Sequence, residues 1–323
     1  MKILVTGCAG YIGSTLTRLL LDKGYDVIGL DNLSFGGDSM LSFYNNKKFN
    51  FVHGDIRDEK ILDEVLKEAD AVAHLAAIVG DPACSKYADE ARSINWEGSK
   101  LLFDKCNTLS NVKRFVFAST CSNYGKMEGD SFVTEESALN PVSLYAELKV
   151  KFEKYLLESK LRDGFVATAL RFATVYGLST RMRFDLTVNE FTRDAASGKE
   201  LVIFGEQFWR PYCHVEDLAR AVILVIESDA SLVNQNVFGV GDTDENYQKK
   251  MIADEIINVI PETIVKYVQK DEDPRDYRVD FSKIKNTLGF QITKHLKDGV
   301  IEVNSIIKNK VLADPYSKAY QNT

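Results

Sequence analysis

Short apolar runs alternate with amphipathic segments along the first half of the chain. The short apolar runs predict buried strands at residues 3–5, 27–30, 49–52, 71–75, 115–118 and 166–170. Segments with apolar residues at helical spacing lie between them, at residues 12–21, 61–67, 87–106 and 144–157. This alternation is typical of an α/β fold with a doubly wound parallel sheet.

The alternation loosens after about Phe172. Helical spacing recurs at residues 184–196, 217–227, 249–259 and 296–308, with short strand signals at 201–204 and 236–240. We therefore predict a smaller, interleaved second domain. In this interpretation the first domain covers residues 1–172, residues 211–242 return to it, and residues 173–210 and 243–323 form the second domain.

Composition and charge narrow the classes of partner. The chain has 323 residues, of which 45% are hydrophobic, and its net charge is -7. Basic residues are scattered, so neither nucleic acid nor a membrane surface is an expected partner. Met1 leads directly into a predicted strand, and no apolar run reaches membrane-spanning length, which favours a cytoplasmic location. Five cysteines without a CxxC pair favour reduced thiols, and no metal site is expected.

A glycine-rich loop follows the first predicted strand and leads into a helix. Gly7, Gly10 and Gly13 have the spacing GxxGxxG, which lets the backbone approach a pyrophosphate bound at the helix N-terminus. A glycine triplet alone also fits an ordinary tight turn. The strand before it, the helix after it and Asp31 at the end of the second strand favour a dinucleotide site in a Rossmann domain. Because the Asp31 carboxylate would accept from a ribose 2′-hydroxyl and repel a 2′-phosphate, we predict NAD rather than NADP.

A hydroxyl-rich segment, STCSNYG at residues 119–125, follows the fifth predicted strand. Ligands bind at such strand ends in open α/β sheets. Downstream, Tyr145 and Lys149 lie one turn apart on one face of a predicted helix. The ammonium is expected to stabilise the phenolate and to move the tyrosine pKa toward the operating range. By itself this pair is common on protein surfaces, but with the glycine loop and Thr120 it predicts an acid–base site.

These motifs together resemble those of the extended short-chain dehydrogenase/reductases that act on nucleotide sugars. In order and spacing they are TGCAGYIGS, Asp31-Asn32, HGDIRD, HLAA, STCSNYG, YAELK and LRFATVYG. The resemblance covers nearly the whole chain and includes the UDP-glucose 4-epimerases. The later segments RMRFDLTVNEFT and EDPRDYRV are similar to those of a branch that includes GDP-heptose 4-dehydrogenases.

The resemblance implies roles for individual residues. Those implied in NAD binding are Gly7, Gly10, Tyr11, Ile12, Gly13, Asp31, Asn32, Asp55, Ile56, Leu75, Ala76, Ala77, Tyr145, Lys149 and Phe172. Those implied in catalysis are Thr120, Tyr145 as the base and Lys149 as its partner. Those implied in binding a nucleotide-diphosphate sugar are Thr120, Thr174, Arg181, Arg183, Asn189, Arg210 and Arg275. Many relatives have asparagine at the position of Thr174. A homodimer through the helices at 87–106 and 144–157 is also implied.

The implied reaction is NAD-dependent hydride transfer at carbon 4 of the sugar. If the keto sugar rotates within the site and accepts the hydride on its other face, the enzyme is a 4-epimerase. If the keto sugar leaves, it is a 4-dehydrogenase, and the sequence leaves both open. A non-catalytic dinucleotide sensor is disfavoured, because Tyr145 and Lys149 are both present.

The residues after Thr120 bear on a further reaction, the elimination of water. The related 4,6-dehydratases have an Asp-Glu pair directly after the catalytic threonine, and this chain has Cys121 and Ser122 there. We therefore expect no dehydration, unless another acid such as Asp81 reaches the sugar.

Overall fold

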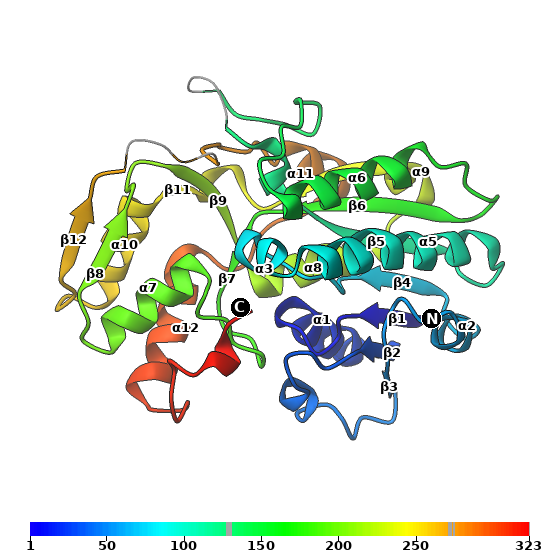
Figure 1. Cartoon of the computed structure of the whole chain (residues 1–323), viewed down its shortest axis with the longest axis horizontal. Helices are drawn as coiled ribbons and strands as arrows, with labels where there is room; N and C mark the ends of the chain where they lie inside the picture. The colour runs from blue at the N-terminus through cyan, green and yellow to red at the C-terminus, as the bar shows by residue number, and fades with distance from the viewer. Residues whose placement is uncertain (127–130, 271–272, 274, 323) are drawn as a thin grey trace.

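The structure, a computed structural model, describes residues 1–126, 131–270, 273 and 275–322 (Figure 1). A seven-stranded sheet in the order β10-β6-β5-β4-β1-β2-β3 forms one half of the molecule, and all its neighbouring strands are parallel. The strands are β1 (Lys2–Thr6), β2 (Asp26–Asp31), β3 (Phe49–His53), β4 (Ala71–His74), β5 (Arg114–Thr120), β6 (Val166–Phe172) and β10 (Asn236–Val240). This confirms the predicted doubly wound sheet, with each predicted strand in place.

Helices cover both faces of this sheet (Figure 1). One face is covered by α1 (Tyr11–Asp22), α8 (Val215–Glu227) and α11 (Ser282–Leu288), which bury residues such as Leu16, Leu20 and Val222 against it. The other face is covered by α2 (Glu59–Leu66), α5 (Ser99–Thr108) and α6 (Leu144–Glu158), with Phe103 and Phe152 at the centre of the packing. Burial of a phenylalanine side chain stabilises a fold by about 1.5–3 kcal/mol.

Shorter helices link these elements. They are α3 (Asp81–Lys86), α4 (Ala88–Arg92) and α9 (Ala230–Val233). A π-helical segment, Ser93–Gly98, joins α4 directly to α5. The helix predicted at 87–106 is therefore continuous along the chain but has a wider turn at its centre.

The second half of the molecule is smaller and contains two short sheets. One has the order β11 (Asn246–Gln248), β9 (Trp209–His214) and β7 (Thr174–Tyr176), and the other pairs β12 (Val265–Val268) with β8 (Leu201–Phe204). Its helices are α7 (Thr187–Ala196), α10 (Lys249–Val259) and α12 (Leu296–Lys308), which pack around residues such as Val188, Ile252 and Val300. The first of these begins three residues later than predicted. The functional division of the chain between two domains stays a prediction.

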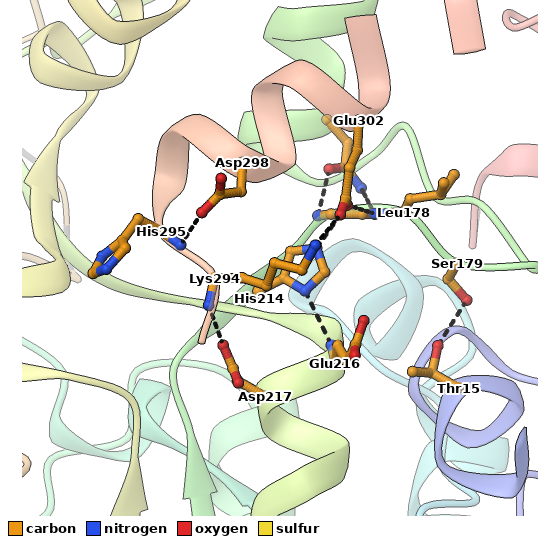
Figure 2. Close-up of polar contacts among 12 residues, drawn as sticks. Thr15, Leu178, Ser179, His214, Glu216, Asp217, Lys294, His295, Asp298 and Glu302 are labelled. Atoms are coloured by element: carbon orange, nitrogen blue, oxygen red, sulfur yellow. Dashed lines mark hydrogen bonds and ion pairs between the residues drawn. The ribbon is translucent and has the colours of Figure 1, made fainter. Parts of the chain in front are cut away.

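A partly buried polar cluster joins α12 and β9 of the second half to the start of α8, which packs on the large sheet. Figure 2 shows Glu302 of α12 pointing at His214, which ends β9. His214 Nδ1 accepts from the backbone N–H of Glu216, so its Nε2–H donates to Glu302 at 2.9 Å. Burial would raise the pKa of Glu302, but hydrogen bonds from His214 and Lys294 lower it to about 2. The same carboxylate accepts from Leu178 N–H at 3.3 Å and thereby fixes the loop after β7.

Candidate active site

A cavity of about 770 Å³ lies where the carboxyl ends of the parallel strands meet the second half of the molecule. All but one of the predicted site residues line it. These are Gly7, Gly10, Tyr11, Ile12, Gly13, Asp31, Asn32, Asp55, Ile56, Leu75, Ala76, Ala77, Thr120, Tyr145, Lys149, Phe172, Thr174, Arg181, Arg183, Arg210 and Arg275. The fold therefore brings together residues that are up to 268 positions apart in the sequence, from Gly7 to Arg275.

The exception is Asn189, which is fully buried and outside the cavity lining. Its Oδ1 accepts from Gly177 N–H at 2.9 Å, and its Nδ2 donates to Tyr11 Oη and to Arg183 O, each at 3.0 Å. All of its polar atoms are thus used to hold the loop after β7 against α1. The structure does not bring Asn189 to the place where a substrate would bind.

The glycine loop has the geometry that anion binding requires. Gly7 has a φ of 74°, which favours glycine, and a Cβ on Gly13 would collide with the carbonyl oxygen of Gly7. No side chain caps the N-terminus of α1, whose first residues line the cavity. The free N–H groups and the helix dipole there suit a pyrophosphate.

Asp31 stands at the end of β2 beside this loop. Its Oδ2 accepts from Ala9 N–H at 3.0 Å and its Oδ1 from Leu33 N–H at 2.8 Å. Burial raises the pKa of Asp31, and the two backbone hydrogen bonds partly offset this rise. A carboxylate oxygen can accept more than one hydrogen bond, so Asp31 can still receive a ribose hydroxyl. The residues present fit the adenosine end of NAD.

Asp55 is already engaged by a cation. Arg57 donates to both of its oxygens, at 2.9 and 2.7 Å, and Asn32 Nδ2 lies 3.4 Å from Oδ2. These contacts lower the pKa of Asp55 although its burial opposes the change. The neighbouring Ile56 is buried and offers an apolar surface to the cavity.

Thr120, Tyr145 and Lys149 all line the cavity, and Thr120 forms a hydrogen bond with the Tyr145 phenol. Thr120 ends β5, and Tyr145 and Lys149 lie on α6, whose N-cap Ser143 accepts from Ala146 N–H. Lys149 is only 4% exposed, and its Nζ donates to Ala118 O at 2.6 Å. Burial lowers the pKa of Lys149 to about 8. Two chemically active side chains of one helix are thus fixed against the strand that carries Thr120.

The pKa of Tyr145 differs from the expectation based on its spacing to Lys149. Burial raises this pKa, and a hydrogen bond with Thr120 opposes the rise only in part. The ammonium of Lys149 is held by Ala118 O and lies 5.9 Å from the centre of the tyrosine ring. The phenol is therefore the form that the protein side chains favour.

A buried network behind the catalytic residues was missed by the sequence analysis. Glu153 is 1% exposed and accepts from Ser119 Oγ at 2.6 Å, Arg171 Nη2 at 2.6 Å and Asn123 Nδ2 at 3.4 Å. It joins α6 to β5 and β6. The only signal in the sequence was an acidic residue beside the buried Phe152 on the apolar side of the helix.

The side chains after Thr120 offer no acid in the structure. Cys121 is 1% exposed, its Sγ donates to Arg171 O at 3.3 Å, and burial raises its pKa. Ser122 lines the cavity. Asp81 accepts from Ser143 Oγ at 2.7 Å and pairs with Arg275 at 2.8 Å, so its carboxylate is already engaged.

Three of the four predicted substrate arginines pair with carboxylates. Arg210 pairs with Asp273 at 2.8 Å, Arg275 with Asp81, and Arg183 with Asp185. Arg181 instead donates to two carbonyl oxygens. Further lining residues that the sequence did not indicate include Lys249, Lys318, Gln321 and Asn322, and no local motif marks them.

Neither a membrane-spanning helix nor a metal cluster occurs in the described part of the chain. No helix in residues 1–126, 131–270, 273 and 275–322 is long and apolar enough to cross a membrane. Within the same residues no group of three or more His, Cys, Asp or Glu side chains could hold a metal ion. All five cysteines are free and buried.

One cavity thus holds the glycine loop, the Asp31 carboxylate and the cluster of Thr120, Tyr145 and Lys149. A comparison with known protein families agrees with this arrangement. The model of the NAD dependent epimerase/dehydratase family matches residues 3–241. The chain belongs to this family. Membership confirms the predicted family and the prediction of an NAD-dependent enzyme.

Relatives in this family differ in reaction. The UDP-glucose 4-epimerase of Lactobacillus helveticus is 31% identical over 326 residues, which cover 93% of this chain and 95% of that protein. The UDP-glucuronic acid 4-epimerase from Bacillus cereus, solved with UDP-glucuronic acid and NAD, is 27% identical with a TM-score of 0.85, covering 96% of this chain and 100% of that one. The dTDP-glucose 4,6-dehydratase from Streptomyces venezuelae, solved with NAD, is 26% identical with a TM-score of 0.84, covering 96% and 98%.

Proposed function

We propose that this protein is an NAD-dependent 4-epimerase of a nucleotide-diphosphate sugar, acting through a 4-keto intermediate. One observation carries the proposal. A single cavity joins the glycine loop, the hydroxyls of Thr120 and Tyr145, and Arg210, and neither of the two residues directly after Thr120 carries a carboxylate. The site has the groups for hydride transfer at carbon 4 and lacks those for elimination.

In this mechanism the protein moves a proton and holds the sugar. Tyr145 accepts the proton of the 4-hydroxyl, and Thr120, which shares a hydrogen bond with the phenol, positions that hydroxyl. NAD held by the glycine loop and Asp31 would supply the reversible hydride acceptor for carbon 4. Because the protein's own side chains favour the phenol, the phenolate form of Tyr145 that accepts the proton needs a nearby positive charge, and Lys149, 5.9 Å from the ring centre, contributes one. The phenol formed in this step returns its proton to the sugar oxygen in the second half of the reaction.

Arg210 and Arg275 are the proposed ligands of the substrate diphosphate. Planar guanidinium groups suit phosphate oxygens because they donate two parallel hydrogen bonds. Both arginines line the cavity and are ion-paired with Asp273 and Asp81. Those carboxylates hold the two guanidinium groups in place at the cavity wall.

Dehydration would need a free acid and base beside the sugar, and the described lining of the cavity does not offer them. In the described part of the chain the carboxylates that line the cavity are Asp31, Asp55, Glu90 and Asp273. Asp55 and Glu90 contact Arg57, and Asp273 pairs with Arg210. Asp31 belongs to the glycine-loop end. Dehydration needs a base that removes the carbon 5 proton and an acid that protonates the carbon 6 hydroxyl. Among the described residues that line the cavity, no free carboxylate lies next to Thr120 to serve in either step.

Product analysis tests the proposal. The purified protein is incubated with UDP-, GDP-, CDP- and dTDP-hexoses, and products are analysed by NMR and mass spectrometry. We expect a 4-epimer with the mass of its substrate. Release of a keto sugar with stoichiometric NADH would instead support a 4-dehydrogenase. A product lighter than its substrate by one water would contradict the interpretation of Cys121 and Ser122.

We also propose that two copies pair through α5 and α6. These helices lie on one face of the large sheet, and Trp96 of the π-helical segment that continues into α5 is half-buried in edge contact with Tyr155 of α6. Leu148 and Phe152 are buried within the chain itself, so they do not form the proposed contact surface. Light scattering coupled to size-exclusion chromatography tests the proposal, with a mass of twice 36.3 kDa expected. The cytoplasmic location stays a prediction.

A further inference from the structure

Arg181 is a buried cation in a position that a carboxylate does not neutralise. It is 7% exposed and lines the cavity, and among the described residues no carboxylate forms an ion pair with it. Its Nη1 donates to Met182 O and its Nη2 to Gln321 O, each at 3.1 Å. Burial and the neighbouring Arg183 lower its pKa to about 10. A buried charge without a partner is costly, so this position favours an anionic ligand.

Arg181 lies at the glycine-loop end of the cavity. Its guanidinium stands over the ring of Phe35, 4.8 Å from the centroid, in the loop that follows Asp31. Its backbone N–H contacts Ser179 Oγ, and that hydroxyl donates to Tyr11 O at 2.8 Å in the first turn of α1. Figure 2 shows Ser179 also facing Thr15 of the same helix. The nearest anionic ligand expected here is therefore the dinucleotide pyrophosphate.

The C-terminal segment, residues 316–322, is packed against the same place. Figure 1 shows it (red) running from α12 back toward the start of α1. Phe184 N–H donates to Tyr320 O at 2.9 Å, and the two rings meet edge to face. Tyr316 donates to Asp194 at 2.9 Å, with Lys199 over its ring. The segment is thus attached at both of its ends to the second half of the molecule.

This segment presents polar side chains to the cavity that are free to bind a ligand. Asn322 is 9% exposed and lines the cavity, and its amide forms no hydrogen bond with the described residues. Lys318 also lines the cavity and forms no ion pair with them. The Asn322 side chain is thus held in place by its burial, while its amide faces the cavity and can form its hydrogen bonds with a ligand there.

We propose that Arg181 and the C-terminal segment complete the NAD site, with Lys318 and Asn322 contacting the bound dinucleotide and Gln321 O orienting Arg181. This inference rests on the proposed function, because epimerisation requires one dinucleotide to take a hydride and return it before dissociating. The segment slows NAD dissociation. Arg181, which the family resemblance suggested for the substrate, thereby belongs to the cofactor.

The test measures dissociation of the dinucleotide without any sugar. The protein is loaded with NADH, mixed with excess NAD in a stopped-flow instrument, and followed by NADH fluorescence. We expect Asn322→Ala and Lys318→Ala each to release NADH about 3- to 10-fold faster, the effect of one lost hydrogen bond or charge contact. Two matched control variants at exposed positions, Asn45→Ala and Lys297→Ala, should release it at the parental rate.

A second measurement keeps the test independent of any single variant. Hydrogen exchange of the parent protein should show slower exchange in residues 316–322 when NAD is added alone. Parental dissociation rates for Asn322→Ala and Lys318→Ala, or unchanged exchange in this segment, would overturn the proposal. If the parent protein binds NADH but the variants behave like the parent, only the role of the C-terminal segment is overturned and the proposed function stands. If the parent protein binds no NADH, the proposed function and the role of the segment are both contradicted.

Discussion

Glu153 of α6 and Arg171 of β6 form a buried ion pair, with 2.6 Å between Oε1 and Nη2. The two side chains are 1% and 5% exposed. Glu153 also accepts from Ser119, the residue before Thr120, and Arg171 donates to Tyr124 Oη at 3.0 Å. The pair therefore fixes the helix that carries Tyr145 and Lys149 relative to the strand end that carries Thr120.

Glu153→Gln should weaken both the fold and the reaction. Arg171 would keep a buried charge without a counter-charge, a change that costs about 3–5 kcal/mol in comparable pairs. Because Glu153 lies outside the cavity lining, we expect kcat to fall while KM for the sugar changes little. Urea denaturation and steady-state kinetics measure the two effects. Glu147→Gln, at an exposed position on the same helix, is the control. Equal losses in kcat and in sugar affinity would argue against a positioning role.

Tyr145→Phe should abolish most turnover without disturbing the fold. Loss of a positioned acid or base lowers the rate by roughly 10²- to 10⁴-fold. Thr120→Ala should also reduce kcat, because its hydroxyl is hydrogen-bonded to the phenol. NADH fluorescence titration should give parental affinity for both variants. Tyr44→Phe, at an exposed tyrosine, serves as the control. Near-parental turnover of Tyr145→Phe on the true substrate would rule out this tyrosine as the base.

Asp31 should make the protein selective for NAD. Its oxygens already accept from two backbone N–H groups, and a 2′-phosphate beside them would meet a second negative charge. Chromatography of the dinucleotide extracted from the purified protein should find NAD. Asp31→Asn removes the repulsion and should narrow the ratio of NADP to NAD dissociation constants. NADP as the resident dinucleotide of the parent protein would refute this role.

Lys149→Met should stabilise the protein while removing activity. Burial lowers the pKa of Lys149 to about 8, below its value in the unfolded chain, so the unfolded state binds more protons between these values. Stability of the parent should therefore rise with pH from about 8 to about 10.5, and the charged lysine should cost up to about 3 kcal/mol below that window. The lost hydrogen bond to Ala118 offsets part of the gain.

Urea denaturation at several pH values measures this effect. At pH 7 we expect the variant to gain about 1–3 kcal/mol in the free energy of unfolding, with a flatter pH dependence above pH 8. Lys151→Met, at an exposed position on α6, is the control. A variant that is less stable than the parent at pH 7, with the same pH dependence, would contradict the lowered pKa.

Short-range patterns in the sequence determined the large sheet and the glycine loop. The strands β1 to β6 and the helix α1 follow from apolar runs and spacings within a few residues. Asp31 and the glycines occupy fixed offsets from β1 and β2, so their chemistry could be inferred without knowing the rest of the fold. The same holds for Tyr145 and Lys149, which one helical turn brings together.

Tertiary structure alone decided the contacts between distant segments. Arg181 meets Gln321 O across 140 residues, and Arg275 meets Asp81 although no local pattern relates them. Asn189 matches a position that the family resemblance assigns to substrate binding. The packing of α7 instead directs its side chain into the core, where it is hydrogen-bonded to Tyr11 and Gly177. Periodicity and spacing describe neighbours along the chain, whereas burial, ion pairing and pKa depend on what the completed fold places around each side chain.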